Sequence, residues 1–516
     1  MSARKKNRNI RKTVQCKEQK IMYKIEREPQ ISLTDFGQAL GVKLNPNNRW
    51  VKKAAMIPWD NLEEEYAQQF SDLTGAPAKP LRVALGSLLI QKQLKFSDRE
   101  LVEEIRENPY FQYFIGMSEY TDKEPFVASL FVEFRKRLDE ETLAKINEQI
   151  IEYNLKSEND DNNSDNDNSD GGNSEAANQN MNGSDSENDD SGEKNKGTLI
   201  IDATCAPQNI RYPQDVSLLN EAREKLEGII LHICDKFRYY APRMYRKNAR
   251  KDYLNFAKSK KRSGKKVRTA IRKQLQYVRR DLGYIEEFLS YADVEVTQKE
   301  AETISVITKV YEQQLYMYEN KVHTVEDRIV SISQPYIRPI VRGKAKSPVE
   351  FGAKLDLSVD EHGMARLEKL SFDAYNEAEV LKTAAENYRK RTGHYPERIL
   401  ADQIYRNKDN INFCKERGIR LLGKPLGRPK KESDVDKKTE YRDGVDRIEV
   451  ERKFSLSKRK FGLGLIMTKL ESTTKASVWL SIIAMNIDRL AAAFLRFFYS
   501  MLFMLFHIDN HKYCYQ

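Results

Sequence analysis

The run Gly197-Thr198-Leu199-Ile200-Ile201-Asp202 indicates the fold class of this chain. It is a short apolar stretch closed by a carboxylate, which is the pattern of a buried strand with an acid at its exposed end. The later run Arg398-Ile399-Leu400-Ala401-Asp402 repeats the pattern. As neighbouring parallel strands, the two runs would place Asp202 and Asp402 at the same edge of one sheet.

The segments around these two runs alternate between strand and helix patterns. Residues 351–359 and 365–371 predict a hairpin that turns at Glu361-His362-Gly363. Helices are expected at 377–391 and 407–417, a further strand follows at 418–422, and helical periodicity also fills 215–330. The sequence therefore predicts an α/β sheet that is interrupted by a helical insertion at about 215–335.

A third candidate acid, Glu451, lies in a segment of helical character at 447–460. Arg447, Glu451, Phe454 and Lys458 fall at i, i+4, i+7 and i+11, so they share one helix face. Three acids at one sheet edge cannot all stay ionised without cations, and hard oxygen ligands favour Mg²⁺ or Mn²⁺. Two such ions would suit a phosphodiester displacement.

The pattern leaves other interpretations of these acids open. A strand-ending Asp is often a turn or cap residue, and a Glu–Lys spacing on a helix is usually a solvated ion pair. Four further acids are not excluded from such a site: Asp356, Asp373, Asp446 and Glu449.

The predicted insertion is strongly basic, with 18 Lys and Arg residues and a single acid, Asp252, between residues 236 and 280. Such a segment predicts strong, salt-sensitive and largely sequence-independent binding to nucleic-acid phosphates. Its aromatic residues could stack on unpaired bases, although most are expected to pack the helices together. The basic residues around Ser263-Gly264 are interpreted as a loop on the DNA backbone. The predicted DNA contacts are Lys260, Lys261, Arg262, Lys265, Lys266, Arg268, Arg272, Arg243 and Arg246.

Charge is unevenly distributed over the 516 residues, whose formal net charge is +11. Residues 158–193 contain 12 acidic and no basic residues, so a disordered linker rich in Asn, Asp and Ser is predicted at 157–197. Without that stretch the net charge of the chain rises to +23. This excess favours a polyanionic partner such as nucleic acid, the alternative being an ordinary basic protein with a solubility tail.

Residues 1–156 predict a helical N-terminal domain. Ser97-Asp98-Arg99-Glu100 is a capping box between an amphipathic helix that begins near residue 80 and a second helix. The two helices could form a helix-turn-helix that binds a DNA groove, but a plain helical packing unit is the commoner outcome of such a pattern.

Residues 476–516 predict an apolar C-terminal helix. Asn486, Asp488, Arg489 and Arg496 interrupt its apolar run, which favours a helix packed on the core or a dimer surface over a membrane anchor. Five scattered cysteines without a CxxC pair argue against structural zinc and for a reducing compartment. We therefore expect a cytoplasmic protein, associated with the nucleoid when it binds DNA.

Several blocks of the sequence resemble the DDE transposases of bacterial insertion sequences. The blocks are LIIDATCAPQNIRYPQDVSLLNEAR, PIVRGKAKSPVEFGAKL, LSFDAYNEAE, RILADQIYRNKDNINFCKERGIRLLGKPLGRP and VERKFSLSKRKFGLGLIMTKL, which together span about residues 198–470. The segment 80–138 also resembles the N-terminal DNA-binding region of that family. The match is specific because extended blocks agree in the order that the family requires.

The resemblance implies a catalytic domain at 198–475 with a ribonuclease H-like mixed sheet flanked by helices. Asp202 would lie on the first strand, Asp402 after the fourth, and Glu451 on a later helix, together holding two Mg²⁺ or Mn²⁺ ions. Arg447 and Lys458 would contact DNA phosphates near the reacting bond. The implied activity is metal-dependent DNA cleavage and strand transfer at the terminal inverted repeats of an element, with target DNA as second substrate and a homodimer as the active form.

The helix that contains Glu451 departs from the family pattern at three positions. Gly444 replaces the tyrosine of the motif around the glutamate, and Arg452 and Ser455 stand where the family tends to have glycine. One alternative is therefore a catalytically impaired relic or DNA-binding regulator. A second alternative is an RNA-binding protein whose main feature is the basic insertion.

Overall fold

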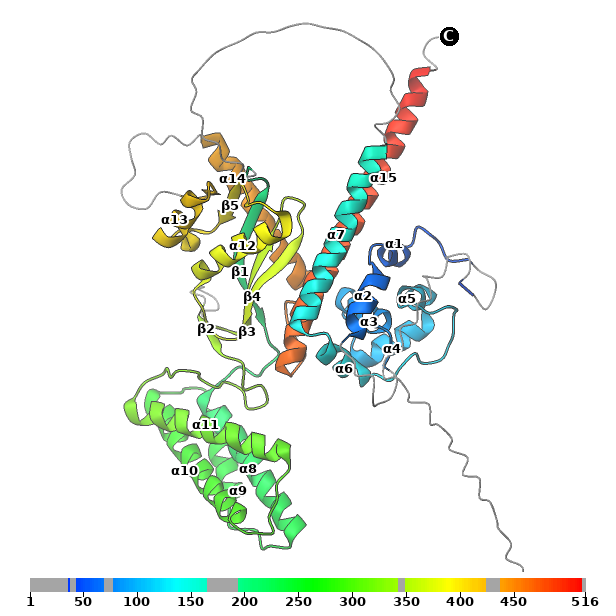
Figure 1. The fold of residues 1–516 in the computed structure, drawn as a ribbon. Helices are drawn as coiled ribbons and strands as arrows, with labels where there is room; N and C mark the ends of the chain where they lie inside the picture. Colours follow the sequence, from blue (N-terminus) through cyan, green and yellow to red (C-terminus); the bar gives the residue numbers. More distant parts are fainter. Residues whose placement is uncertain are drawn as a thin grey trace, which may run out of the picture. The chain divides into compact units, whose positions relative to one another are not determined.

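The computed structural model describes residues 36–37, 43–68, 78–164, 194–341, 349–423 and 437–512, without the side chains of 157–164, 437 and 494–512. The chain divides into two compact units. The first unit comprises Met1–Gln91, Phe96–Phe134 and Glu148–Asn159, and the second unit comprises the remaining residues. Their helices and strands are labelled in Figure 1.

Helices joined by loops make up the described secondary structure between residues 43 and 164. In chain order these are α1 (Arg49–Ala55), α2 (Trp59–Ala67), α3 (Leu81–Leu94), α4 (Asp98–Glu107), α5 (Pro109–Phe114), α6 (Leu130–Arg137) and α7 (Glu140–Ser164). Trp50 packs edge-to-face against Phe111 and Phe114, with ring centroids 5.2 Å apart in both pairs. These aromatic contacts hold α1 against α5 in the first unit.

The predicted capping box at the start of α4 is confirmed. The Ser97 hydroxyl accepts from the Glu100 backbone N–H at 3.3 Å, and the Glu100 carboxylate accepts from the Ser97 N–H at 2.8 Å. Each side chain thus satisfies an N–H group that the helix itself cannot use. A role of α3 and α4 in DNA binding stays a prediction.

The predicted linker overlaps the end of α7, which continues to Ser164. Residues 157–164 of the predicted linker are therefore helical, and residues 165–193 lie outside the described residues.

A mixed sheet lies at the centre of the second unit. Its strands are β1 (Thr198–Pro207), β2 (Pro339–Val341), β3 (Val349–Val359), β4 (Ala365–Ser371), β5 (Arg398–Ala401) and β6 (Arg420–Leu421). They run in the order β2-β3-β1-β5-β6, and β4 also pairs with β3. The pairs of β3 with β1, β2 and β4 are antiparallel, whereas those of β5 with β1 and β6 are parallel. The α/β class and the β3–β4 hairpin agree with the sequence prediction.

Strand β1 is longer than its apolar run predicted, so the expectation that Asp202 ends the strand is wrong. The residues after Asp202 remain paired with the long strand β3, up to Pro207 opposite Gly352. Only the pairing of β1 with β5 stops near Asp202, at Ile201 opposite Ala401. A long antiparallel partner on one side thus extends β1 beyond the point where its short parallel partner ends.

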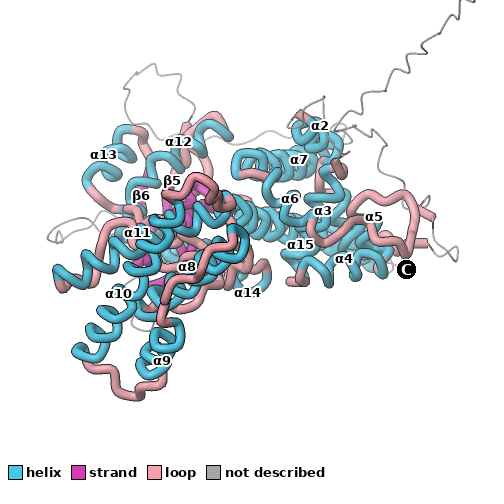
Figure 2. Tube along the Cα trace, turned by 90° about the horizontal axis from the view of Figure 1, so that it is seen from below, coloured by secondary structure: helices cyan, strands magenta, loops and turns pink. Residues whose placement is uncertain are grey.

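Two sets of helices cover the sheet of the second unit (Figures 1 and 2). Leu199 and Ile201 of β1 pack with residues of α12 (Val380–Thr392, preceded by the 3-10 turn η1, Glu377–Glu379) and α13 (Lys408–Glu416). The alternate residues of β1 face α14 (Lys437–Lys460), since the Lys458 ammonium donates to the Thr204 hydroxyl. The period of two along β1 therefore places Asp202 on the side that faces α14.

Helix α15 (Glu471–Lys512) follows α14 and contacts β4. Its stretch Glu471–Ala493 is long and apolar enough to cross a membrane by composition, but 72% of the most apolar window is buried inside the structure. Ile482, Ile483 and Met485 are fully buried. Burial of this kind is what a core helix of a globular protein shows.

Four helices form the segment between β1 and β2, where helical periodicity was predicted. They are α8 (Asp215–Phe237), α9 (Arg246–Ala257), α10 (Gly264–Leu289) and α11 (Gln298–Asn320), drawn in green in Figure 1. They share a core of their own that includes Leu226, Ile230, Val278 and Ile307. We call this segment the helical insertion.

Candidate active site

Asp202 and Asp402 lie at adjacent positions of neighbouring parallel strands, as their sequence pattern predicted. Ile201 of β1 is in register with Ala401, the last residue of β5, so each acid directly follows one member of that pair. Asp202 is half-buried, and its carboxylate accepts from the Ala203 N–H at 2.8 Å. Asp402 is exposed, and its carboxylate accepts from the Gln403 N–H at 2.7 Å.

The electrostatic surroundings of Asp202 disfavour its ionised form. Its pKa is raised to about 6, chiefly by burial and also by the negative charges of Asp402 and Glu377. The Ala203 N–H and the Arg447 guanidinium oppose this rise. Burial thus makes the ionised form of Asp202 costly, and a bound cation would relieve that cost.

The predicted face of α14 is the face that lies against β1. Arg447 acts electrostatically on Asp202, and the Lys458 ammonium donates to the Thr204 hydroxyl at 2.8 Å. Phe454, between them on the same face, is 9% exposed. The helical spacing therefore places Glu451 along the edge of β1 as well.

The Glu451 carboxylate nevertheless points to its own helix. It forms an ion pair with Arg447 at 3.0 Å, and 53% of its side chain is exposed. Among the residues that the structure describes, no three His, Cys, Asp or Glu side chains are grouped as metal ligands. The carboxylates of Asp202, Asp402 and Glu451 each accept from a nearby N–H group.

The contacts of three other candidate acids, Asp446, Glu449 and Asp373, do not indicate a role in the site. Asp446 pairs with Arg398 at 2.8 Å, and Glu449 pairs with Arg452 at 3.5 Å and Lys453 at 3.8 Å. The Asp373 side chain is 69% exposed. Surface ion pairs of this kind contribute little to stability and do not indicate a function.

Asp356 is the buried acid beneath the site. It lies on β3 opposite Ala203 and is fully buried. Tyr405, three residues after Asp402, donates its hydroxyl to Asp356 Oδ1 at 2.5 Å, and the Tyr375 hydroxyl donates to Asp356 Oδ2. Burial and Glu377 raise the pKa of Asp356 to about 6, although both tyrosine hydroxyls and Lys354 oppose this.

Glu377 and Lys354 complete this buried network. The Lys354 ammonium pairs with the Glu377 carboxylate at 2.9 Å and donates to the Tyr375 carbonyl at 2.8 Å. Sequence reasoning missed Glu377, Tyr375 and Tyr405. The available signal was Asp356 itself, a carboxylate inside an apolar strand run, because a buried acid requires hydrogen-bond donors from elsewhere in the fold.

A second buried acid attaches α14 to the sheet. Asp443 accepts from Arg398 of β5 at 2.6 Å and from Arg420 of β6, and its side chain is 1% exposed. Burial opposes its ionisation, but the hydrogen bonds from Arg420 and Arg398 lower its pKa overall. This ion pair network positions the helix that presents Arg447, Glu451 and Lys458.

The nine predicted DNA contacts are all exposed in the helical insertion. The expected loop around Ser263-Gly264 is wrong in part, because α10 begins at Gly264 with Ser263 as its N-cap residue. Lys265, Lys266, Arg268 and Arg272 are therefore helical residues. Four of the nine make contacts within the insertion. Arg246 pairs with Glu227 at 3.4 Å, and Arg262 donates to the Ala257 carbonyl at 2.9 Å. Arg268 stacks over Tyr318 at 4.1 Å, and Arg243 lies over the ring of Tyr245 at 4.7 Å.

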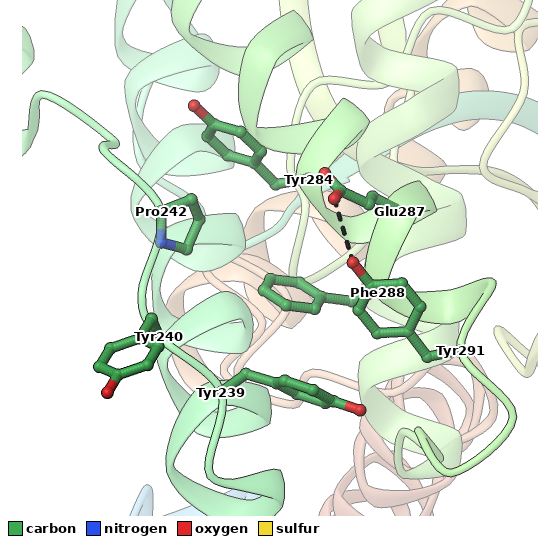
Figure 3. A pocket seen from close by; sticks show the side chains of 7 residues that line it. All are labelled: Tyr239, Tyr240, Pro242, Tyr284, Glu287, Phe288 and Tyr291. Atoms are coloured by element: carbon green, nitrogen blue, oxygen red, sulfur yellow. Dashed lines mark hydrogen bonds between the residues drawn. The ribbon is translucent and has the colours of Figure 1, made fainter.

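The aromatic residues of the insertion mainly pack together, as expected. Figure 3 shows a cavity of about 440 Å³ lined by Tyr239, Tyr240, Pro242, Tyr284, Glu287, Phe288 and Tyr291. The rings of Tyr239 and Tyr291 lie 5.4 Å apart, and the Tyr291 hydroxyl donates to Glu287 at 3.0 Å. The lining has one acid and no Lys or Arg, so its chemistry does not favour phosphate.

Comparisons with known proteins match two regions of the chain. A family profile described as "Transposase DDE domain" matches residues 399–488, and one described as "Transposase domain (DUF772)" matches residues 38–137. A Rhizobium meliloti protein described as "Uncharacterized protein ORF8 in nfe locus" is 30% identical over 122 residues. That match covers 24% of this chain and 58% of the relative. No solved structure matches the chain.

Proposed function

We propose that the chain is a DDE transposase of an insertion sequence, which binds the ends of its element and catalyses DNA cleavage and strand transfer. Two transposase family profiles, which match residues 399–488 and 38–137, support this proposal. The observation that carries the proposal is the juxtaposition of Asp202 and Asp402 at one edge of the sheet, with Arg447 of α14 within electrostatic range of Asp202. The substrate is double-stranded DNA, both the terminal repeats of the element and the target.

A ribonuclease H-like core is the fold that we propose for the second unit. Its support is the strand order β4-β3-β1-β5-β6, in which β3 is antiparallel to both β1 and β4, and β5 and β6 run parallel to β1. The first acid lies on the central strand β1 and the second follows its parallel neighbour β5. Fold alone does not define chemistry, so catalysis is inferred from the acids.

Asp202, Asp402 and Glu451 are the residues that we propose would hold divalent cations. All their donor atoms are hard carboxylate oxygens, which fits Mg²⁺ or Mn²⁺, and burial raises the pKa of Asp202, a cost that a cation would offset. When bound, a pair of such ions stabilises the charge that develops in a phosphodiester displacement. Glu451 would have to leave its ion pair with Arg447 to join the other two acids.

Arg447 and Lys458 are proposed to hold DNA phosphates beside the acids. Once Glu451 turns away, the guanidinium of Arg447 is available for two parallel hydrogen bonds to a phosphate, whereas Lys458 supplies a point charge. Gly444, Arg452 and Ser455 do not interrupt α14, which continues from Lys437 to Lys460. The departures from the family pattern thus leave the helix that presents these groups intact.

Joining two element ends requires that both be held together, so we propose a homodimer as the active form. The exposed basic residues of the helical insertion would bind DNA backbone largely without regard to sequence. This activity would place the protein with DNA in the cytoplasm.

The impaired relic or regulator is the second candidate function. It is favoured by the pairing of Glu451 with Arg447 and by the absence of a three-acid group among the described side chains. Such a protein would bind the same DNA but would not cleave it.

One variant tests the catalytic proposal. Asp402→Asn is expected to lower Mg²⁺- or Mn²⁺-dependent nicking of end-containing DNA by at least about 100-fold, the scale of losing a preorganised electrostatic group. DNA affinity, measured by fluorescence anisotropy, should stay within about twofold, because Asp402 itself repels phosphate.

The matched control is Asp409→Asn, an exposed acid on α13 that should leave both measurements unchanged. Equal loss of cleavage and affinity in Asp402→Asn would contradict a metal-ligand role. A wild-type chain that binds the DNA but never nicks it would establish the relic instead.

A further inference from the structure

A cleft of about 410 Å³ lies between α9 and α10 of the helical insertion. Phe256 and Ser259 line one wall, and Lys265, Lys266, Lys273 and Gln274 line the other. Its size exceeds that of a phosphate group alone and is in the range of cavities that bind small molecules. A phosphate together with the sugar to which it is attached would fit.

The charge of the cleft is positive. Its single acidic lining residue, Asp252, pairs with Lys273 at 2.8 Å and accepts the Tyr277 hydroxyl at 2.9 Å. Burial raises the pKa of Asp252, but these two partners lower it overall, so the carboxylate is ionised and neutralised inside the wall. Lys265 and Lys266 are exposed and form no ion pair in the part of the chain that the structure describes.

The two lysines also stand in the first turn of α10, whose N–H groups have no partner within the helix. Ser263, the N-cap residue, makes no side-chain hydrogen bond to them. The start of this 26-residue helix therefore adds a partial positive charge to that of the lysines.

The floor of the cleft supplies an independent observation. Gln274 is 1% exposed, lines the cleft, and its Oε1 atom has no hydrogen-bond partner among the described residues. A buried amide oxygen without a partner is costly, and such groups in native structures call for an explanation. The amide can turn to present either its oxygen or its two N–H donors to a ligand.

We propose that this cleft seats one phosphodiester of a DNA strand together with its sugar. Lys265 and Lys266 pair with the phosphate at the mouth, and the Gln274 amide hydrogen-bonds to the bound unit from the floor. The inference rests on the proposed function, because it takes DNA as the partner. It deepens that function by assigning a defined phosphodiester-binding site in addition to general electrostatic attraction. In this site the uncharged Gln274 contributes to DNA affinity.

The test uses the full-length chain and two probes. A 20-base-pair duplex measures DNA binding by fluorescence anisotropy at several salt concentrations. The dinucleotide pdTpdT, followed by phosphorus NMR line broadening, measures the phosphodiester-binding site itself without a need for element ends or catalysis. The variants are Lys265→Gln with Lys266→Gln, and Gln274→Leu. The control is Lys299→Gln with Lys309→Gln, two exposed lysines of α11 outside the cleft.

The paired lysine variant is expected to lose pdTpdT binding and to weaken duplex binding by about tenfold at about 0.1 M salt. The slope of log K against log salt should fall by about 1.8 in magnitude, since each lost phosphate contact contributes about 0.9. Gln274→Leu removes no charge, so we expect at least about fivefold weaker binding of both probes with an unchanged salt slope.

Two results would contradict the proposed phosphodiester-binding site. One is wild-type affinity of Gln274→Leu for both probes, because a merely structural amide can be replaced by a leucine of similar volume. The other is an equal loss of affinity in the α11 control. Should the chain fail to nick DNA while pdTpdT binding still depends on the cleft residues, the catalytic proposal would be contradicted and the binding-site proposal would be retained.

Discussion

Single carboxylates define the candidate site at the residue scale. Asp202 is half-buried with a pKa raised to about 6, whereas Asp356, one strand away on β3, is fully buried and takes hydroxyl donors from Tyr375 and Tyr405. Tyr405 belongs to the turn that follows Asp402. The buried network thus ties the position of Asp402 to the interior of the sheet.

Tyr405→Phe is expected to loosen that turn. Removing its hydroxyl leaves Asp356 with one fewer donor, which should destabilise the fold by about 1–3 kcal/mol. The loss should be largest above pH 6, where Asp356 is ionised and depends most on the donor. Denaturant unfolding at pH 5 and pH 8 measures the loss in free energy of unfolding. In nicking assays of the same variant, the Mg²⁺ concentration for half-maximal activity should rise.

The control for this variant is Tyr395→Phe. Tyr395 donates its hydroxyl to Glu386 at 2.8 Å and packs at the edge of the same core, away from Asp356. Its replacement should leave the Mg²⁺ requirement unchanged. The same rise in both variants would mean that Tyr405 acts only through general stability.

At the scale of elements, α14 decides whether the site can assemble. It presents Arg447, Glu451 and Lys458 from one face, and Phe454 anchors that face against the sheet. Its first half is held by Asp443, whose carboxylate bridges Arg398 of β5 and Arg420 of β6. One buried acid therefore joins the helix to two strands.

Asp443→Asn is expected to destabilise the second unit by about 3 kcal/mol, because breaking a buried ion pair leaves charges without compensation. The lowered pKa of Asp443 also gives the pair a pH dependence. The stability that the ion pair contributes to the fold is present above the ordinary Asp pKa of 3.8. It is lost as the pH falls through the lower pKa that Asp443 has in the folded chain. Thermal unfolding between pH 3 and pH 7 should show this acid-sensitive step only in the parent chain.

Asp446→Asn provides the comparison, because Asp446 pairs with the same Arg398 from a position where 36% of its side chain is exposed. Its loss should cost less than about 1 kcal/mol. If the Asp443 and Asp446 variants were equally stable, the attachment of α14 would not depend on the buried pair.

On the scale of the whole molecule, charge is separated along the chain. Residues 165–193 contain nine acidic and no basic residues, while residues 236–280 contain 18 basic residues. An acidic segment of the same chain is expected to compete with DNA for a basic surface, and salt should weaken that competition.

Replacing the nine acidic residues of 165–193 by Asn and Gln is therefore expected to tighten duplex DNA binding. We expect about three- to tenfold higher affinity at about 50 mM salt, and no difference near 300 mM, where screening is strong. Anisotropy titrations at both salt concentrations check this. A variant with the same acidic residues in shuffled order serves as the control, since it should bind as the parent does. Equal affinities of the neutral and parent chains at low salt would contradict the competition.

Much of the second unit could be predicted from local pattern. The apolar runs ending at Asp202 and Asp402 predicted two parallel neighbours, and the spacing of Arg447, Glu451 and Lys458 predicted one helix face against the site. Both rest on periodicities that the backbone imposes wherever a strand or helix forms. The length of β1 was not predictable in this way, because its second half depends on pairing with β3.

The sequence by itself determined the α/β class, the helical insertion and the concentration of positive charge, since these follow from periodicity and composition. Only the tertiary structure decided which polar groups meet, as with Tyr405 and Asp356, Asp443 with its two arginines, and Gln274 on the floor of its cleft. The physical reason is that a buried polar group takes its partner from whichever element the fold brings near, however distant in the chain.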